Sequence, residues 1–195
     1  MIRLFDILFS TLGLIILSPL FVILYILIRT ESKGGAFYVQ ERIGKDGRPF
    51  GLYKFRTMRV GSDTEGLLTI GEHDNRITRI GYYLRKTKID ELPQLLNVVK
   101  GDMSLVGPRP EVKKYVDLYT DEQRRVLNVR PGVTDYASIE YVNENELLSK
   151  AEDPDRVYIE EVMPDKIKLN MKYLEHYTVH EYFKIIFLTI KSLIA

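Results

Sequence analysis

Hydrophobic residues fill the start of the chain almost without interruption. From residue 7 to residue 28 there are 22 residues without a charge. A straight helix of that length would be about 33 Å long, which is enough to cross the hydrocarbon core of a bilayer. Ser18 and Pro19 stand in the middle of this stretch. Because proline removes a backbone donor, the pattern predicts a membrane helix that is kinked or broken near its midpoint.

Two topologies fit this stretch, and the residues alone leave both open. A spanning helix with a kink is the default for its length. A re-entrant helix–break–helix, entering and leaving the membrane by one face, also explains the proline. The flanking charges, Arg3 on one side and Arg29 and Lys33 on the other, give a poor positive-inside asymmetry.

Later segments alternate between strand and helix patterns. Residues 34–58 are aromatic and β-branched around the turn "GKDGRP" and predict a β-hairpin. Residues 59–75 predict a loop, residues 75–103 two helices, residues 111–129 an amphipathic helix, and residues 140–161 a mobile surface connection. The last thirty or so residues predict a core helix or one lying in the membrane interface. The fold class is therefore mixed α/β, mostly helical with a small β-hairpin.

Composition narrows the possible functions. The chain has 195 residues, a formal net charge of +1 and no cysteine. The even charge balance gives no sign of a nucleic-acid partner, and the lack of cysteine excludes disulfides and thiol catalysis. Any electrostatic work must come from local clusters.

The densest polar cluster is "RKTKIDELPQLLNVVKGDMSLVGPRP". It places Asp90 and Glu91 side by side at a predicted helix start, with Arg85 before them and Arg109 after them. Two neighbouring carboxylates repel unless a cation shares the site, and Mg²⁺ would also bring phosphate oxygens. The cluster fits phosphoryl transfer, although from residue types alone Asp90 is more often only the cap of its helix.

The order of motifs resembles the bacterial sugar transferase family, the monotopic phosphoglycosyl transferases. The resemblance rests on "FDILFSTLGLIILSPLF", "YKFRTM", "TKIDELPQLLNVVKGDMSLVGPRP" and "VRPGVTD", in that order, and covers almost the whole chain. It is similar to the minimal catalytic form of the family.

This resemblance implies a topology and a location. Ser18 and Pro19 would break a re-entrant membrane helix over residues 1–29, and Arg3 would anchor its short end among lipid headgroups. Residues 30–195 would form a cytosolic catalytic domain with interfacial amphipathic helices. The expected location is the bacterial inner (cytoplasmic) membrane, with the active site on the cytosolic face and a homodimer possible.

The resemblance also implies a reaction. Asp90 would attack the β-phosphorus of a UDP-sugar, releasing UMP, and polyprenyl phosphate would then take the phosphosugar from the aspartate, in the first membrane step of glycan assembly. Glu91 would act as a Mg²⁺ ligand, alongside Asp90, or as a proton acceptor. The phosphate- and nucleotide-binding residues that the family pattern indicates are Arg109, Pro108, Arg85, Lys54 and Arg130.

Three positions depart from the family pattern. Asp135 replaces a glycine, Val142 falls where many relatives carry an arginine, and Asn170 falls where some carry aspartate. These changes put the phosphate and sugar contacts of that region in doubt. Two other functions remain open from the sequence, a Mg²⁺-dependent membrane phosphohydrolase and a non-enzymatic single-pass anchor with a scaffold domain.

Overall fold

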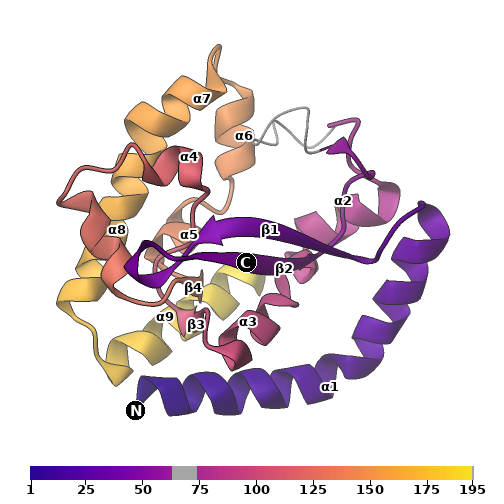
Figure 1. Cartoon of the computed structure of the whole chain (residues 1–195), viewed down its shortest axis with the longest axis horizontal. Coiled ribbons are helices and arrows are strands. Elements are labelled where there is room, and N and C mark those ends of the chain that lie inside the picture. Colours follow the sequence, from indigo (N-terminus) through magenta and orange to yellow (C-terminus); the bar gives the residue numbers. More distant parts are fainter. Residues whose placement is uncertain (63–73, 195) are drawn as a thin grey trace.

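A computed structural model describes residues 1–62 and 74–194 (Figure 1). The expectation of a mostly helical chain with a small β-hairpin is confirmed. The longer helices are α1 (Ile2–Glu31), α2 (Arg79–Lys86), α3 (Gln94–Lys100), α8 (Met163–Glu175) and α9 (Val179–Ile194). Shorter ones are α4 (Lys113–Val116), α5 (Tyr136–Glu140), α6 (Glu144–Ser149) and α7 (Pro154–Val157), with 3-10 turns η1 (Lys45–Gly47), η3 (Ile89–Glu91) and η4 (Gln123–Asn128) and the π-helical turn η5 (Tyr158–Val162).

Helix α1 is one continuous helix that bends instead of breaking. Figure 1 shows it running along the base of the molecule and then turning upward at its far end. Pro19 lies inside it, so the carbonyl of Ile15, four residues earlier, has no amide donor. The Ser18 hydroxyl donates to that carbonyl at 2.8 Å and replaces the missing hydrogen bond. Among the described residues, α1 is the helix that is long and apolar enough to cross a membrane.

The amino-terminal end of α1 is fastened to the body of the protein by polar contacts. The Arg3 guanidinium donates to the carbonyls of Val98 at 2.7 Å and Val99 at 3.1 Å, at the end of α3. Arg3 thus caps the end of a helix of the same chain, and the expectation that it anchors this end among lipid headgroups stays a prediction. Asp6 is 2 % exposed and accepts from the Leu105 amide at 2.9 Å and the Tyr182 hydroxyl at 3.0 Å.

The other end of α1 is fastened in the same way. Glu31 accepts from the Arg79 amide at 2.7 Å, at the start of α2. Arg56, which follows the hairpin, donates to the Ser32 carbonyl at 2.9 Å. Both ends of the apolar helix therefore contact one body, while its middle exposes large hydrophobic side chains, among them Leu12, Ile15, Ile16, Val22 and Ile23.

The predicted hairpin is confirmed. Strands β1 (Phe37–Ile43) and β2 (Pro49–Phe55) are antiparallel, with Phe37 opposite Phe55. Asp46 and Gly47 make the turn with positive φ angles of 58° and 72°, which the sequence "KDG" favours. A second, parallel pair joins β3 (Ser104–Val106) to β4 (Gly132–Thr134) and sets the "GPRP" turn beside the "RPG" turn.

Two stretches differ from their prediction. Residues 111–129 form the short helix α4 and the turn η4 instead of one amphipathic helix. Residues 140–161 are not a loose connection, because they form α6, α7 and part of η5. Leu148 and Tyr158 are 1 % and 3 % exposed and pack in the largest core cluster with Tyr115 and Val162. A few buried apolar side chains thus order a segment that is otherwise acidic.

Candidate active site

The two adjacent carboxylates lie on η3, between α2 and α3. Lys88 precedes them with a φ of 57°, and this left-handed residue turns the chain so that η3 can start. Asp90 does not cap α3, because the N-cap position belongs to Pro93 and no side chain caps that end. Capping therefore does not account for Asp90. The predicted end of the helix at Gly101 is confirmed, since that residue has a φ of 102°.

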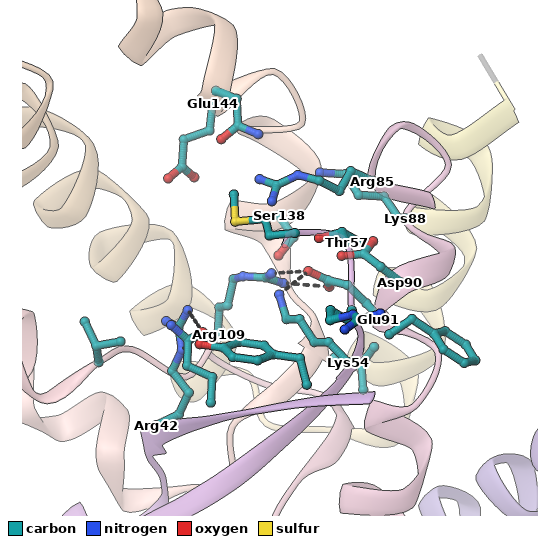
Figure 2. A pocket seen from close by; sticks show the side chains of 18 of the residues that line it. Arg42, Lys54, Thr57, Arg85, Lys88, Asp90, Glu91, Arg109, Ser138 and Glu144 are labelled. Carbon is teal, nitrogen blue, oxygen red and sulfur yellow. Dashed lines mark hydrogen bonds and ion pairs between the residues drawn. The ribbon is translucent and has the colours of Figure 1, made fainter. Parts of the chain in front are cut away.

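Glu91 is held by two cations that come from distant parts of the chain (Figure 2). The Arg109 Nη1 donates to Glu91 Oε2 at 3.1 Å, and its Nη2 donates to Oε1 in the same two-pronged contact. Lys54, on β2, donates to Glu91 Oε1 at 3.0 Å. Two-pronged binding fixes the plane of the guanidinium as well as its position.

These contacts set the charges of the site. Burial works against the charge on Glu91, but Arg109 and then Lys54 outweigh it and hold the pKa of Glu91 well below its usual 4.5. Burial lowers the pKa of Lys54 from its usual 10.5, and the Glu91 carboxylate offsets part of this effect. Glu91 is therefore an anion that is held in place by Arg109 and Lys54.

Asp90 is in a different state from its neighbour. It is 7 % exposed and accepts no hydrogen bond from the described residues. Burial raises the pKa of Asp90 from its usual 3.8, and Lys54 opposes this rise. The two adjacent carboxylates thus have different environments, since Glu91 is bound to two cations and Asp90 has no such hydrogen bond among the described residues.

Both carboxylates face a cavity of about 640 Å³. Such a volume is typical of small-molecule sites. The basic residues that line it are Arg42, Lys54, Arg56, Arg59, Arg76, Arg85, Lys88, Arg109 and Lys166, and the acidic ones are Asp90, Glu91, Glu111 and Glu144. Among the described residues the cavity is strongly cationic, which suits a ligand with several phosphate charges.

The structure brings some predicted residues together and leaves two outside the cavity. Lys54, Arg85, Asp90, Glu91 and Arg109 all line it. Pro108 does not, and its carbonyl accepts from the Gly132 amide at 2.9 Å. Arg130 also lies elsewhere, with its Nε donating to the Gly101 carbonyl at 2.9 Å.

Several residues of the site were not predicted. Asp135 is fully buried and accepts from the backbone amides of Arg109 at 3.1 Å and Ser138 at 2.6 Å, so it holds the "GPRP" turn in place. The sequence hinted at a special role for Asp135, because this residue stands where the family pattern has a glycine. Arg42, Glu111, Glu144 and Lys166 gave no such signal, because they come from segments far apart in the chain.

Comparison with known proteins shows which family this chain belongs to. The model of the family described as bacterial sugar transferase matches residues 1–195. The chain belongs to the bacterial sugar transferase family. In this member of the family, Asp90 and Glu91 line a cationic cavity.

Three relatives match nearly the whole chain. It is 36 % identical over 195 residues to the UDP-N-acetylgalactosamine-undecaprenyl-phosphate N-acetylgalactosaminephosphotransferase of Aeromonas hydrophila, covering 97 % of this chain and 43 % of the relative. It is 34 % identical over 192 residues to the UDP-glucose:undecaprenyl-phosphate glucose-1-phosphate transferase of Klebsiella pneumoniae, covering 96 % and 39 %. It is 37 % identical over 200 residues to the galactosyl transferase CpsE of Streptococcus agalactiae, covering 97 % and 41 %. The chain therefore spans about two fifths of the length of these relatives.

Proposed function

We propose that this protein transfers a phosphosugar from a UDP-sugar to a polyprenyl phosphate at a membrane surface. One observation supports this most directly: the unpartnered Asp90 carboxylate beside a cation-bound Glu91 in a cationic cavity. The names of the relatives supply the substrate class, because two of them are transferases of a sugar phosphate from a UDP-sugar to undecaprenyl phosphate.

The proposed reaction has two displacements at one phosphorus. An Asp90 oxygen attacks the β-phosphorus of the UDP-sugar, the bond from that phosphorus to the bridging oxygen breaks, and UMP leaves with the electron pair. An oxygen of polyprenyl phosphate then attacks the same phosphorus and displaces the aspartate, giving polyprenyl diphosphosugar. Asp90 is regenerated as a carboxylate, so no oxidant or further reactant is needed.

The basic residues of the cavity would stabilise the negative charge of the phosphates. Arg109 and Lys54 lie where the phosphates would meet Asp90, and their charges stabilise the equatorial oxygens of the transferred group. Arg85 and Lys88 line the same cavity and add to the positive field. Glu91 holds Arg109 and Lys54 in position and neutralises part of their charge before the substrate binds.

Mg²⁺ is part of the proposal. Among the described residues no group of three or more His, Asp or Glu side chains could hold a metal alone. Asp90 and the Oε2 oxygen of Glu91, which accepts one hydrogen bond, fit an ion that takes its other ligands from water and the diphosphate. Such an ion would supply charge neutralisation at the phosphates.

We further propose that α1 is re-entrant and that the cavity faces the cytosol at the bacterial inner membrane. The support is the fastening of both ends of α1 to one body, which places them on the same side of the apolar middle. The exposed aromatic residues Phe183 and Phe187 of α9 add an apolar surface suited to the membrane interface. A homodimer stays a prediction.

Topology can be measured with single cysteines, because the chain has none of its own. We expect Leu4→Cys and Lys33→Cys, both at exposed positions flanking the bend, to react with a membrane-impermeant thiol reagent from the same side of sealed vesicles. A spanning helix would protect one of the two until the vesicles are opened. That outcome would reject the re-entrant arrangement and favour a single-pass anchor.

The pH dependence of the rate should be bell-shaped. Asp90 must be ionised to attack, and its raised pKa moves the loss of activity on acidification to a higher pH than for an ordinary aspartate. Lys54 must stay protonated, and its lowered pKa moves the alkaline loss below pH 10.5. Lys54→Arg keeps the charge, so we expect its alkaline limb to lie at higher pH. An alkaline limb that does not move would contradict this role of Lys54.

The function itself is tested by incubating the protein with a panel of UDP-sugars, with and without polyprenyl phosphate, while measuring UMP and lipid-linked product. Transfer predicts sustained UMP release only with the lipid acceptor. Sustained release without acceptor would support the alternative phosphohydrolase, and no release from any UDP-sugar would favour the scaffold.

A further inference from the structure

The cavity has two ends that differ in charge. At the end away from Asp90, each cation has its own carboxylate: Arg42 is 3.3 Å from Glu111, and Lys166 is 2.9 Å from Glu144. We call these four residues the ion-pair end. Figure 2 shows Glu144 across the cavity from Asp90.

The opposite end carries cations without such partners. Arg85 and Lys88 line it, and neither forms an ion pair within the part of the chain that the structure describes. Phosphate groups are attracted to unpaired cations and repelled by carboxylates. Among the parts of a UDP-sugar, the diphosphate therefore belongs near Arg85 and Lys88, and the ion-pair end suits a neutral group rich in hydroxyls.

The ion-pair end also has an acceptor oxygen that makes no hydrogen bond with the described residues. Glu144 accepts from Lys166 through Oε2 alone, so its Oε1 has no partner among the described residues. Between this end and Asp90, the hydroxyl oxygen of Ser138 also lines the cavity (Figure 2); it is buried and has no hydrogen-bond partner among the residues that the structure describes. A buried polar group without a partner is costly, so it indicates a place for a ligand's polar atoms.

Glu144 differs in this from Glu111. The latter is occupied by Arg42, by the Tyr158 hydroxyl and by the Val112 amide, and its side chain is only 12 % exposed. The Glu144 side chain is 24 % exposed, while the side chain of its partner Lys166 is only 10 % exposed. Lys166 also lies 5.4 Å from the centre of the Tyr158 ring, which fixes its ammonium group.

We propose that Glu144, positioned by Lys166, accepts hydrogen bonds from the hydroxyls of the transferred sugar and determines which sugar is accepted. This inference rests on the proposed function. A carboxylate oxygen accepts well from a hydroxyl in the right place and gains nothing from one that points elsewhere. Sugars that differ only in the direction of one hydroxyl are therefore distinguished by this contact.

The test compares wild type with Glu144→Gln on pairs of UDP-sugars that differ only at C4, UDP-glucose with UDP-galactose and their N-acetylated counterparts. UMP release is measured at saturating polyprenyl phosphate. We expect wild type to prefer one epimer and Glu144→Gln to reduce the ratio of the two kcat/KM values about tenfold or more. Glu146→Gln is the matched control, because Glu146 lies on the same helix with a side chain that is 62 % exposed and outside the cavity.

Each outcome has a defined meaning. Equal loss of kcat/KM for every UDP-sugar would assign Glu144 to the shared nucleotide and overturn the inference, as would an unchanged ratio or a wild type that does not discriminate in any pair. If Glu144→Gln does not fold, Glu144→Asp keeps the charge with a shorter reach and should lose the same discrimination. A wild type that releases no UMP from any UDP-sugar would overturn the proposed function, and this inference with it.

Discussion

We expect Asp90→Asn to lower the rate of UMP release by about 10⁴-fold or more, while UDP-sugar binding stays measurable. The amide has nearly the shape of the carboxylate but does not attack phosphorus, so the first displacement is lost. Glu91, Arg109 and Lys54 keep their mutual contacts in this variant, because none of them bonds to Asp90. The measurement is single-turnover UMP release together with calorimetric binding of the UDP-sugar.

The control for this variant is Asp117→Asn. Asp117 is a half-exposed aspartate on the protein surface, paired with Lys113 at 2.7 Å and outside the cavity. We expect its rate to equal that of wild type. Retained turnover in Asp90→Asn would mean that another group makes the bond to phosphorus.

Arg109→Lys should lower kcat/KM by about 10²- to 10³-fold although the positive charge is kept. Lysine provides a single ammonium group, so the two-pronged contact with both oxygens of Glu91 is lost. The cation then no longer has a fixed position facing the phosphates, and preorganised donors of this kind are worth about this much in rate. The measurement is steady-state UMP release over a range of UDP-sugar concentrations.

A second effect accompanies this loss. Lysine keeps the charge but loses the two-pronged hydrogen bonds of Arg109 that help to lower the pKa of Glu91, so that pKa should rise. Arg124→Lys, at an exposed position on η4, should leave both quantities unchanged. An Arg109→Lys variant that behaves like this control would show that charge alone matters at position 109.

The sequence predicted the parts of the fold that depend on local pattern. Hairpin residues 37–55, the turn at Asp46 and Gly47 and the stop at Gly101 follow from backbone preferences. The family motifs also predicted part of the site. One cavity is lined by five of the predicted residues, Lys54, Arg85, Asp90, Glu91 and Arg109.

What the sequence could not predict depends on contacts between distant residues. Arg3 lies at the end of an apolar stretch, where an arginine is expected to contact lipid headgroups. In the structure it donates to the Val98 carbonyl at the end of α3, ninety-five residues away in the chain. Residues 140–161 have a polar pattern, and burial of Leu148 and Tyr158 in the core helps to order them. The pairing of Glu144 with Lys166 is of the same kind, since neither residue belongs to a motif.

The most direct test of the central claim is to find the covalent intermediate. Enzyme incubated with a UDP-sugar but no lipid acceptor is quenched, digested with trypsin and analysed by mass spectrometry. Cleavage after Lys88 and Lys100 gives the peptide 89–100, whose carboxylate side chains are Asp90 and Glu91. The proposed covalent mechanism predicts the mass of one sugar phosphate on Asp90, lost when polyprenyl phosphate is added. The same adduct on Glu91 or another residue, or UMP release with no adduct at all, would contradict it.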